Sequence, residues 1–333
     1  MSARWATAGI VGAGSWGTAL AAVTARAGLA TTLWARSPAI AEAIAREREN
    51  RAYLPGVRLP DDLAVTSDLA SIAAADMVLI ATPAQAMRTV LSGLAGIAEG
   101  TPGIICAKGI ERGSDLFMSE VLRQACPALE PYVLSGPSFA VDVVAGLPTA
   151  VTLAGRSAEA ARDLAAAFSL ETFRIYASSD IRGVELGGAV KNVLAIACGI
   201  SDGKRLGDSA RAALTTRGFA ELARLGLALG ARRETLAGLS GLGDLILTCS
   251  SEKSRNFSLG LGLGRGEGLE AILGSRRGIS EGVHSAGVVA AIAARHAIDM
   301  PIAAAVNAIV EGRSSPDAEI ARLLARPVKF EAQ

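Results

Sequence analysis

The sequence predicts an α/β protein in which a doubly wound, mostly parallel sheet of Rossmann type precedes an all-α domain. Up to residue 179, short apolar runs that end in Gly, Pro or Ser turns alternate with helical stretches. This alternation builds parallel sheets through βαβ crossovers, with helices on both faces. From Asp180 onward, long Ala-, Leu- and Gly-rich segments carry helical periodicity. We therefore expect a sheet domain over 1–179 and a helical domain over 180–333.

The first predicted unit is a strand over 6–11 that enters a glycine-rich turn and then a helix. The turn follows the pattern G-x-G-x-x-G and reads Gly12-Ala13-Gly14-Ser15-Trp16-Gly17. Gly12 permits the tight turn, Gly14 lets the backbone approach phosphates, and Gly17 lets the helix pack near the strand. The open N–H groups and positive dipole end of the helix favour an anion. The pattern predicts a dinucleotide site, with an ordinary glycine-rich turn as the alternative.

The remaining elements follow from apolar runs and their terminators. We expect further strands over 30–35, 77–81, 103–107, 132–134, 150–153 and 173–176, with helices over 39–50 and 158–168 between them. The helical domain is predicted over 182–201, 209–229 and 283–297. The glycine-rich run 260–266 resembles a second phosphate loop, but no strand precedes it. We interpret this run as a flexible connection.

Composition excludes several classes of function. The formal net charge is +1 with no dense basic tract, so nucleic-acid binding is not expected. No apolar run approaches the ~20 residues of a membrane span, and glycines interrupt the apolar N-terminal segment, so we expect a cytoplasmic protein. Neither a disulfide framework nor a metal site is indicated, because the four cysteines lack C-x-x-C spacing and only two histidines occur. Proton chemistry must therefore use another side chain.

Arg36 lies 19 positions beyond Gly17, at the end of the second predicted strand. Sites selective for NAD usually place an acidic residue there, on the ribose hydroxyls. An arginine instead offers a planar donor fork to a 2′-phosphate. The position favours NADP over NAD, with dual use or a plain surface arginine as alternatives.

Ligands of open α/β sheets bind beyond the carboxyl ends of the strands. Three turns fall at such ends, namely Thr82-Pro83, Lys108 to Glu111, and Ser135 to Ser138. The second turn would place Lys108 beside the nicotinamide half of the cofactor. Taken alone, this residue also fits a surface lysine.

A second lysine lies in an apolar stretch that begins the helical domain. Lys191 is surrounded by apolar residues on all helical faces, and such a helix is buried. A buried ammonium is costly without a partner. Gly187, Gly188 and Ala195, one turn away, would leave space for a ligand, and Asn192 adds a second polar group. The alternative is a lysine that extends along the helix surface to water.

Two polar segments follow farther along the chain. Asp244 follows a glycine-rich stretch and can pair with Lys191, orient a hydroxyl or cap a helix. Ser254, Arg255 and Asn256 bring a hydroxyl, a guanidinium and an amide to a predicted helix start. This cluster suits a phosphate ester, with simple helix capping as the alternative.

Together these segments resemble the bacterial NAD(P)-dependent sn-glycerol-3-phosphate dehydrogenases. The resemblance runs in order over almost the whole chain, through 12–20, 108–111, 134–140, 187–192, 241–245 and 254–256. It implies a C-terminal domain of the 6-phosphogluconate-dehydrogenase type, a homodimer and a role in making the glycerol phosphate of phospholipids. Two departures stand out. Ser138 occupies a position where Thr is common, and Lys204-Arg205 occupy a loop where small or apolar residues are usual.

The resemblance also implies site residues. For the cofactor these are Ser15, Trp16, Arg36, Ala140, Ile279 and Glu281, with Tyr53 close by and Lys108 and Arg255 shared with the substrate. For the substrate these are Lys108, Gly136, Ser138, Lys191, Asp244, Ser254, Arg255 and Asn256. Lys191 matches the residue assigned as proton acceptor in the family.

The expected reaction is the reversible reduction of dihydroxyacetone phosphate by NADPH or NADH to sn-glycerol 3-phosphate. Lys191 would donate the proton, and burial or a nearby Lys108 would depress its pKa enough for the reverse step. Asp244 would orient Lys191 or a substrate hydroxyl. One alternative is a β-hydroxyacid or 6-phosphogluconate-type dehydrogenase, whose substrates carry a carboxylate. A non-catalytic NADP(H) sensor is the other, although it has no use for Lys191, Asp244 and Arg255 together.

Overall fold

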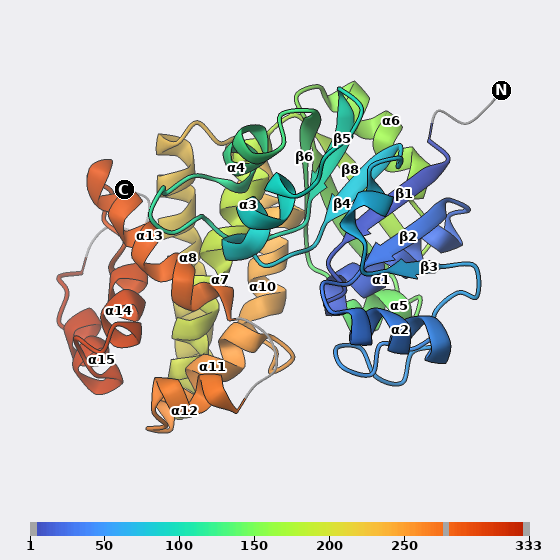
Figure 1. The fold of residues 1–333 in the computed structure, drawn as a ribbon. Helices are drawn as coiled ribbons and strands as arrows, with labels where there is room; N and C mark the ends of the chain where they lie inside the picture. The colour runs from blue at the N-terminus through green and yellow to red at the C-terminus, as the bar shows by residue number, and fades with distance from the viewer. Residues whose placement is uncertain (1–4, 276–279, 329–333) are drawn as a thin grey trace.

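A computed structural model describes residues 5–275 and 280–328 of the chain. Figure 1 shows two parts, a sheet with its covering helices and a set of helices that begins with α7 (Ile181–Gly203). We call them the sheet domain and the helical domain. The last strand ends at Ser178, and the carboxylate of Asp180 accepts a hydrogen bond from the Gly183 N–H at the start of α7. The predicted α/β architecture with an all-α second part is confirmed.

Eight strands form one sheet in the order β3-β2-β1-β4-β5-β6-β7-β8. All neighbouring pairs are parallel except β6 and β7. The short strand β3 is absent from the sequence prediction. The strands are β1 (Thr7–Val11), β2 (Ala30–Trp34), β3 (Ala64–Thr66), β4 (Met77–Ile80), β5 (Thr101–Ile105), β6 (Leu129–Ser135), β7 (Thr149–Ala154) and β8 (Phe173–Ser178).

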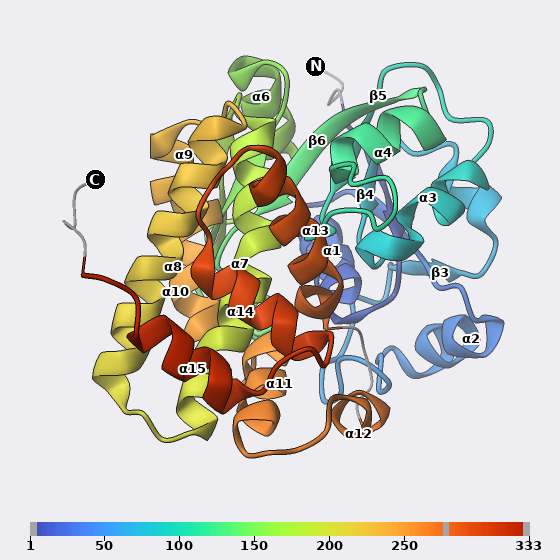
Figure 2. The same ribbon diagram turned by 90° about the vertical axis from the view of Figure 1, so that its left-hand side faces the viewer.

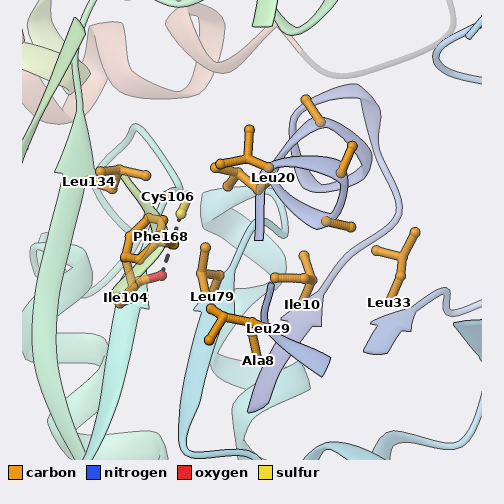
Figure 3. Packing of buried hydrophobic residues seen from close by; sticks show 14 of the residues in the cluster. Ala8, Ile10, Leu20, Leu29, Leu33, Leu79, Ile104, Cys106, Leu134 and Phe168 are labelled. Atoms are coloured by element: carbon orange, nitrogen blue, oxygen red, sulfur yellow. Dashed lines mark hydrogen bonds between the residues drawn. The ribbon is translucent and has the colours of Figure 1, made fainter. Parts of the chain in front are cut away.

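Helices cover both faces of this sheet, as βαβ crossovers require. Figure 3 shows Ile10, Leu79 and Ile104, from three adjacent strands, with Leu20 of α1 and Phe168 of α6 in the same buried cluster. A second buried cluster contains residues of α3 and α4. The helices are α1 (Ser15–Arg26), α2 (Pro38–Glu47), a 3-10 turn (Leu69–Ile72), α3 (Ala84–Ser92), α4 (Met118–Ala125), α5 (Ala140–Val144) and α6 (Ala158–Phe168).

The helical domain is built around α7. Figure 2 shows this helix among its neighbours, and it contacts α8, α10, α11, α13 and α14. By length and composition α7 could cross a membrane, but its apolar stretch is wholly buried inside the protein, so it is a core helix. The helices are α8 (Asp208–Ala228), α9 (Arg233–Ala237), a π-helical turn (Leu239–Gly243), α10 (Asp244–Cys249), α11 (Arg255–Gly264), α12 (Leu269–Gly274), α13 (Glu281–Arg295), α14 (Pro301–Val310) and α15 (Pro316–Leu324).

The run 260–266 is not a flexible connection, and that prediction is wrong. Its first five residues form the end of α11. A Cβ atom at Gly260 would lie 2.1 Å from the carbonyl oxygen of Ile196, and one at Gly264 would lie 2.4 Å from that of Ile200. The glycines therefore let α11 and α7 pack backbone to backbone. Close helix packing, rather than loop mobility, accounts for their spacing.

The unusual pair Lys204-Arg205 ends α7. Lys204 is the C-terminal cap of the helix, and its ammonium lies 2.8 Å from the Asp317 carboxylate of α15. Arg205 has a φ of 57°, in the left-handed region. Lys204 therefore connects the end of the core helix to α15, and Arg205 lies in the turn that follows the helix.

Candidate functional site

The glycine-rich turn has the geometry that its sequence predicts. Gly12 has a φ of +116°, and a Cβ atom there would lie 3.0 Å from the backbone of Ala81. A Cβ at Gly17 would lie 1.8 Å from the Gly12 oxygen, whereas one at Gly14 would meet no atom within 4 Å. The N-cap residue of α1 is Gly14, which has no side chain to accept hydrogen bonds from the first turn. Open space over Gly14 and an uncapped helix end fit a dinucleotide pyrophosphate.

A loop after α2 lies against this turn. The Ser15 hydroxyl donates a hydrogen bond of 2.6 Å to the backbone oxygen of Tyr53, whose side chain is partly exposed. Asn50 donates to the Ala13 oxygen at 2.9 Å and to the Thr18 hydroxyl at 2.8 Å. No sequence pattern singles out Asn50. The buried amide positions the turn, and only the folded chain brings it there.

The other expected cofactor residues differ in their surroundings. Trp16 packs 6.4 Å from the Phe173 ring, and its buried indole N–H has no hydrogen-bond partner in the described part of the chain. Arg36 is exposed just beyond β2, and no ion pair or hydrogen bond holds its guanidinium within residues 5–275 and 280–328. Ala140 is the first residue of α5. Ile279 lies outside the described residues.

Glu281 of the helical domain contacts the start of α3 in the sheet domain. One carboxylate oxygen accepts a hydrogen bond of 3.1 Å from the Ala84 N–H at the start of α3, a favourable place for a negative charge. The other oxygen is buried without a partner among the described residues, and burial raises the pKa of this carboxyl. A buried polar atom without a partner marks a place where a ligand can supply one.

The centre of the site is a hydrogen-bonded network of two lysines and one aspartate. Lys191 of α7 donates to one oxygen of Asp244 at 2.7 Å and to the Thr248 hydroxyl at 2.9 Å. Lys108 donates to the other Asp244 oxygen at 2.6 Å and to the Gly136 carbonyl at 3.2 Å. The side chains of Lys191 and Lys108 are 9% and 19% exposed. The interpretations of Lys191 and Lys108 as surface lysines are therefore wrong.

Burial and the neighbouring charges determine the protonation states of Lys191 and Asp244. Burial, with a smaller contribution from Lys108, lowers the pKa of Lys191 to about 8, although Asp244 acts in the opposite direction. For Asp244 burial acts upward, but the two lysines outweigh it and lower the pKa of the carboxyl. Asp244 therefore stays ionised, and Lys191 can exchange its proton near neutral pH. Gly243, not Asp244, is the N-cap of α10, so the capping interpretation of Asp244 is wrong.

The end of β6 completes the surroundings of Lys108. The Ser138 hydroxyl donates to the Gly136 carbonyl at 3.0 Å, which also receives the bond from Lys108. The buried hydroxyls of Thr82 and Ser135 have no partner within the described ranges. Both hydroxyls lie at carboxyl ends of strands, where α/β proteins bind ligands.

A hydrogen-bonded pair of asparagines connects the predicted substrate segments. Asn192 donates to the Lys108 carbonyl at 3.2 Å, and Asn256 donates to the Asn192 oxygen at 2.9 Å. The Asn256 oxygen also accepts from the Gly282 N–H at 3.0 Å. Within the described residues, one N–H and one oxygen lone pair of the Asn256 amide have no partner and can serve a ligand. The pair holds α7, α11 and α13 in register around the lysines.

Ser254 and Arg255 begin α11. The Ser254 hydroxyl accepts from the Phe257 N–H at 3.2 Å, so the capping interpretation of this serine is confirmed. Arg255 is exposed, and its charge lowers the pKa of Glu281 against the effect of burial. Arg255 therefore lies close enough to Glu281 for their charges to interact, and its contacts with cofactor and substrate remain predictions.

The glycines beside Lys191 have separate roles. A Cβ at Gly187 would lie 2.4 Å from the Ser240 carbonyl, so this glycine serves helix packing and leaves no ligand space. A Cβ at Gly188 would lie 3.2 Å from the Ser135 hydroxyl and 3.3 Å from the Lys108 side chain. The prediction of ligand space is therefore wrong for Gly187. Gly188 faces the site itself.

Thr248 is the main site residue that no sequence motif indicated. It lies one turn after Asp244 on α10, and its hydroxyl donates to the Asp244 backbone oxygen at 2.6 Å. This bond turns the hydroxyl lone pairs toward Lys191. The i, i+4 spacing from Asp244 was a usable signal, because such residues share a helix face.

The fold combines a dinucleotide-binding sheet with a helical second domain, and a buried network of two lysines and one aspartate lies between them. These features define a nicotinamide-dependent oxidoreductase. Two protein-family models, one for each domain, match the chain. Residues 7–161 match the NAD-dependent glycerol-3-phosphate dehydrogenase N-terminus, and residues 180–321 match its C-terminus. The chain belongs to the NAD-dependent glycerol-3-phosphate dehydrogenase family.

Relatives match the chain over nearly its whole length. It is 58% identical over 323 residues to glycerol-3-phosphate dehydrogenase [NAD(P)+] of Parvibaculum lavamentivorans, covering 97% of each chain. Identity to the enzyme of the same name from Bradyrhizobium diazoefficiens is 56%, again covering 97% of each. Glycerol-3-phosphate dehydrogenase from Coxiella burnetii has a solved structure with a TM-score of 0.92 and 39% identity, covering 97% of this chain and 100% of that one.

Proposed function

We propose that the chain catalyses the reversible, NAD(P)H-dependent reduction of dihydroxyacetone phosphate to sn-glycerol 3-phosphate. The observation that carries this proposal is the buried ammonium of Lys191. Asp244 and Thr248 hold it at the junction between the helical domain and the carboxyl ends of the strands. The names of relatives at 58% and 56% identity support the same reaction.

The cofactor site is the turn around Gly14. Bound NADPH or NADH supplies the hydride in reduction and its oxidised form accepts it in the reverse reaction. The space over Gly14 and the uncapped start of α1 suit the pyrophosphate. Exposed Arg36, free of other ion pairs in the described ranges, suits a 2′-phosphate and favours NADP. A lower KM for NADPH than for NADH, lost in Arg36→Ala, is the expected result.

The substrate phosphate has an anion-binding helix end available. Ser254, Arg255 and Asn256 lie at the N-terminus of α11, where backbone N–H groups and a guanidinium favour a negative ligand. The other proposed substrate contacts are Lys108, Gly136 and Ser138, which are joined by hydrogen bonds to the Gly136 carbonyl. A phosphate held in this way orients the keto group toward Lys191.

Lys191 acts as the proton donor in reduction. Its ammonium gives a proton to the developing alkoxide oxygen and stabilises the charge there. In the reverse direction the neutral amine accepts the proton, and a pKa of about 8 makes both forms accessible near neutral pH. Asp244 positions the amine, and its second oxygen holds Lys108.

A substrate panel tests this proposal. Oxidation of NADPH is followed by absorbance with dihydroxyacetone phosphate and, separately, with β-keto acids and other carboxylate substrates. Turnover of dihydroxyacetone phosphate alone is expected. Preference for a carboxylate substrate would support a hydroxyacid dehydrogenase, and cofactor binding without any turnover would support a sensor.

The remaining proposals concern the molecule in the cell. We infer a cytoplasmic homodimer that supplies glycerol phosphate for phospholipids, with the division between its two domains at residues 179 and 180. The resemblance to the family supports the dimer, and light scattering after size-exclusion chromatography tests it. A monomer at micromolar concentration would contradict it.

A further inference from the structure

An ion pair connects the two domains beside the proposed substrate position. The Lys253 ammonium lies 3.1 Å from the Asp142 carboxylate of α5. The same ammonium lies 5.8 Å from the centre of the Phe139 ring, within the range of a cation–π contact. Lys253 belongs to the segment between α10 and α11, so both of its contacts are made across the junction between the domains.

Each partner is adjacent to a proposed substrate contact. Lys253 directly precedes Ser254, and Phe139 directly follows Ser138. Asp142 lies in the first turn of α5, the helix that packs against α1 of the dinucleotide site. A change in the Lys253–Asp142 separation would therefore move the start of α11, the proposed phosphate-binding end, relative to the segment that carries Gly136 and Ser138.

The exposure of the pair argues against a role in stability. The side chains of Lys253 and Asp142 are 58% and 33% exposed, and ion pairs of this kind contribute little to folding. Water and salt compete for both charges, so the contact can open and close at low cost. An exposed bridge between two halves of a site can still change how often the halves are correctly aligned.

We propose that Lys253 and Asp142 are a positioning pair that holds the start of α11 against the 136–140 segment while dihydroxyacetone phosphate is bound. This inference rests on the proposed function. Neither residue touches the reacting atoms. Their contact favours the arrangement in which phosphate-binding groups from both domains face one ligand.

Charge reversal tests the pair. Lys253→Glu and Asp142→Lys each place like charges opposite one another, and each should raise the KM for dihydroxyacetone phosphate about five- to tenfold with a smaller change in kcat. The double variant K253E/D142K restores an opposite-charge pair, so its KM should return to within about twofold of the unmodified enzyme. The differences should shrink as salt is raised to about 0.5 M, because ions screen exposed charges.

Controls separate the ion pair from a change in net charge and from direct phosphate binding. Arg123→Glu changes the net charge as Lys253→Glu does, but on the exposed side of α4, and should leave KM unchanged. All variants should keep the melting temperature and the affinity for NADPH. Direct binding of the substrate phosphate by Lys253 would leave the double variant as poor as Lys253→Glu, and that result would overturn the proposal.

A measurement without substrate keeps the inference distinct from the proposed reaction. Amide hydrogen exchange over 139–147 and 250–258 should accelerate in each single variant and return to the original rate in the double variant. Unchanged exchange in the single variants would show that the two segments are not held by this pair. Failure of the unmodified enzyme to reduce dihydroxyacetone phosphate would instead contradict the proposed function, whatever the exchange result.

Discussion

At the scale of single residues, Lys191 is the side chain on which the proposed chemistry depends. An ammonium in an apolar helix core is destabilising unless a carboxylate compensates for the lost water. Asp244 provides that carboxylate, and Thr248 accepts a second hydrogen bond. The cost of burial remains visible as a depressed pKa, and this is the property that a proton donor working near neutral pH requires.

We predict that Lys191→Ala lowers kcat for dihydroxyacetone phosphate reduction by about 10²–10⁴-fold, the range expected for loss of a general acid. The cofactor turn lies on another element, so the affinity for NADPH should persist. Steady-state kinetics and fluorescence titration with NADPH measure the two effects. Lys204→Ala, at the end of the same helix, should keep normal kinetics. Near-normal turnover by Lys191→Ala would remove lysine from the mechanism.

The pH dependence should reverse with the direction of the reaction. Reduction needs protonated Lys191, so kcat/KM for dihydroxyacetone phosphate should fall as pH rises through about 8. Oxidation of glycerol 3-phosphate needs the neutral amine, so its kcat/KM should rise over the same interval. Initial rates between about pH 6 and pH 10 measure both profiles.

Asp244→Asn provides the control for these profiles. Asp244 raises the pKa of Lys191 against the effects of burial and Lys108. Its removal leaves two facing ammonium groups, so the fall in the reduction profile should move to lower pH and the rate at pH 7 should decrease. An unmoved profile would assign the titration to a group other than Lys191.

At the scale of secondary-structure elements, the glycines of α7 and α11 decide the shape of the helical domain. Gly199 of α7 faces the Phe257 carbonyl of α11, and a Cβ there would lie 2.0 Å from that oxygen. Gly260 and Gly264 face α7 in the same way. Close approach brings Asn256 of α11 to Asn192 of α7, so helix packing also positions the site.

We predict that Gly199→Ala destabilises the protein by about 2 kcal/mol or more, because the overpacking cost exceeds the gain in helix propensity. Chemical denaturation measures this change in the free energy of unfolding. Gly274→Ala serves as the matched control, since a Cβ there meets no atom within 4 Å. This variant should be neutral or slightly stabilised. Equal stability of both variants would contradict the predicted backbone contact.

At the scale of the whole molecule, buried polar contacts join the two domains away from the lysines. Glu185 of α7 accepts hydrogen bonds from the N–H and the hydroxyl of Ser119 in α4, at 2.7 and 3.0 Å. Burial raises the pKa of Glu185 from 4.5 to about 7. The hydrogen bond from the Ala84 N–H to Glu281 is a second polar contact between the domains. Both contacts contain a carboxyl group whose pKa is raised by burial, so the junction is sensitive to pH.

Between pH 4.5 and about 7 the folded protein keeps a proton on Glu185 that the unfolded chain releases. The free energy of unfolding should therefore fall as pH rises through this interval. Glu185→Gln keeps a hydrogen-bonding side chain without the titration, so its melting temperature should fall less between about pH 5 and pH 8. Calorimetric melting of both proteins measures the difference, and parallel pH curves would contradict the assignment. Glu221, whose pKa burial raises to about 7, contributes the same trend in both proteins.

Much of this architecture follows from local sequence. The alternation of apolar runs and turns predicts most strands of the sheet, because strands and amphipathic helices leave separate periodicities. The G-x-G-x-x-G turn predicts its own geometry, since only glycine fits at Gly12 and Gly17. A lone lysine in an apolar helix likewise predicts a buried partner, and Asp244 is among the candidates that the sequence offers for that role.

Only the tertiary structure decides what the remaining polar and glycine residues do. The sequence order does not reveal that Asn50 reaches Ala13, or that Thr248 turns toward Lys191, because these contacts depend on how separate elements are packed. The run 260–266 reads as a loop until α7 lies against it. Local patterns determine the elements and the chemistry they carry, whereas long-range packing and burial determine which groups meet and which pKa values shift.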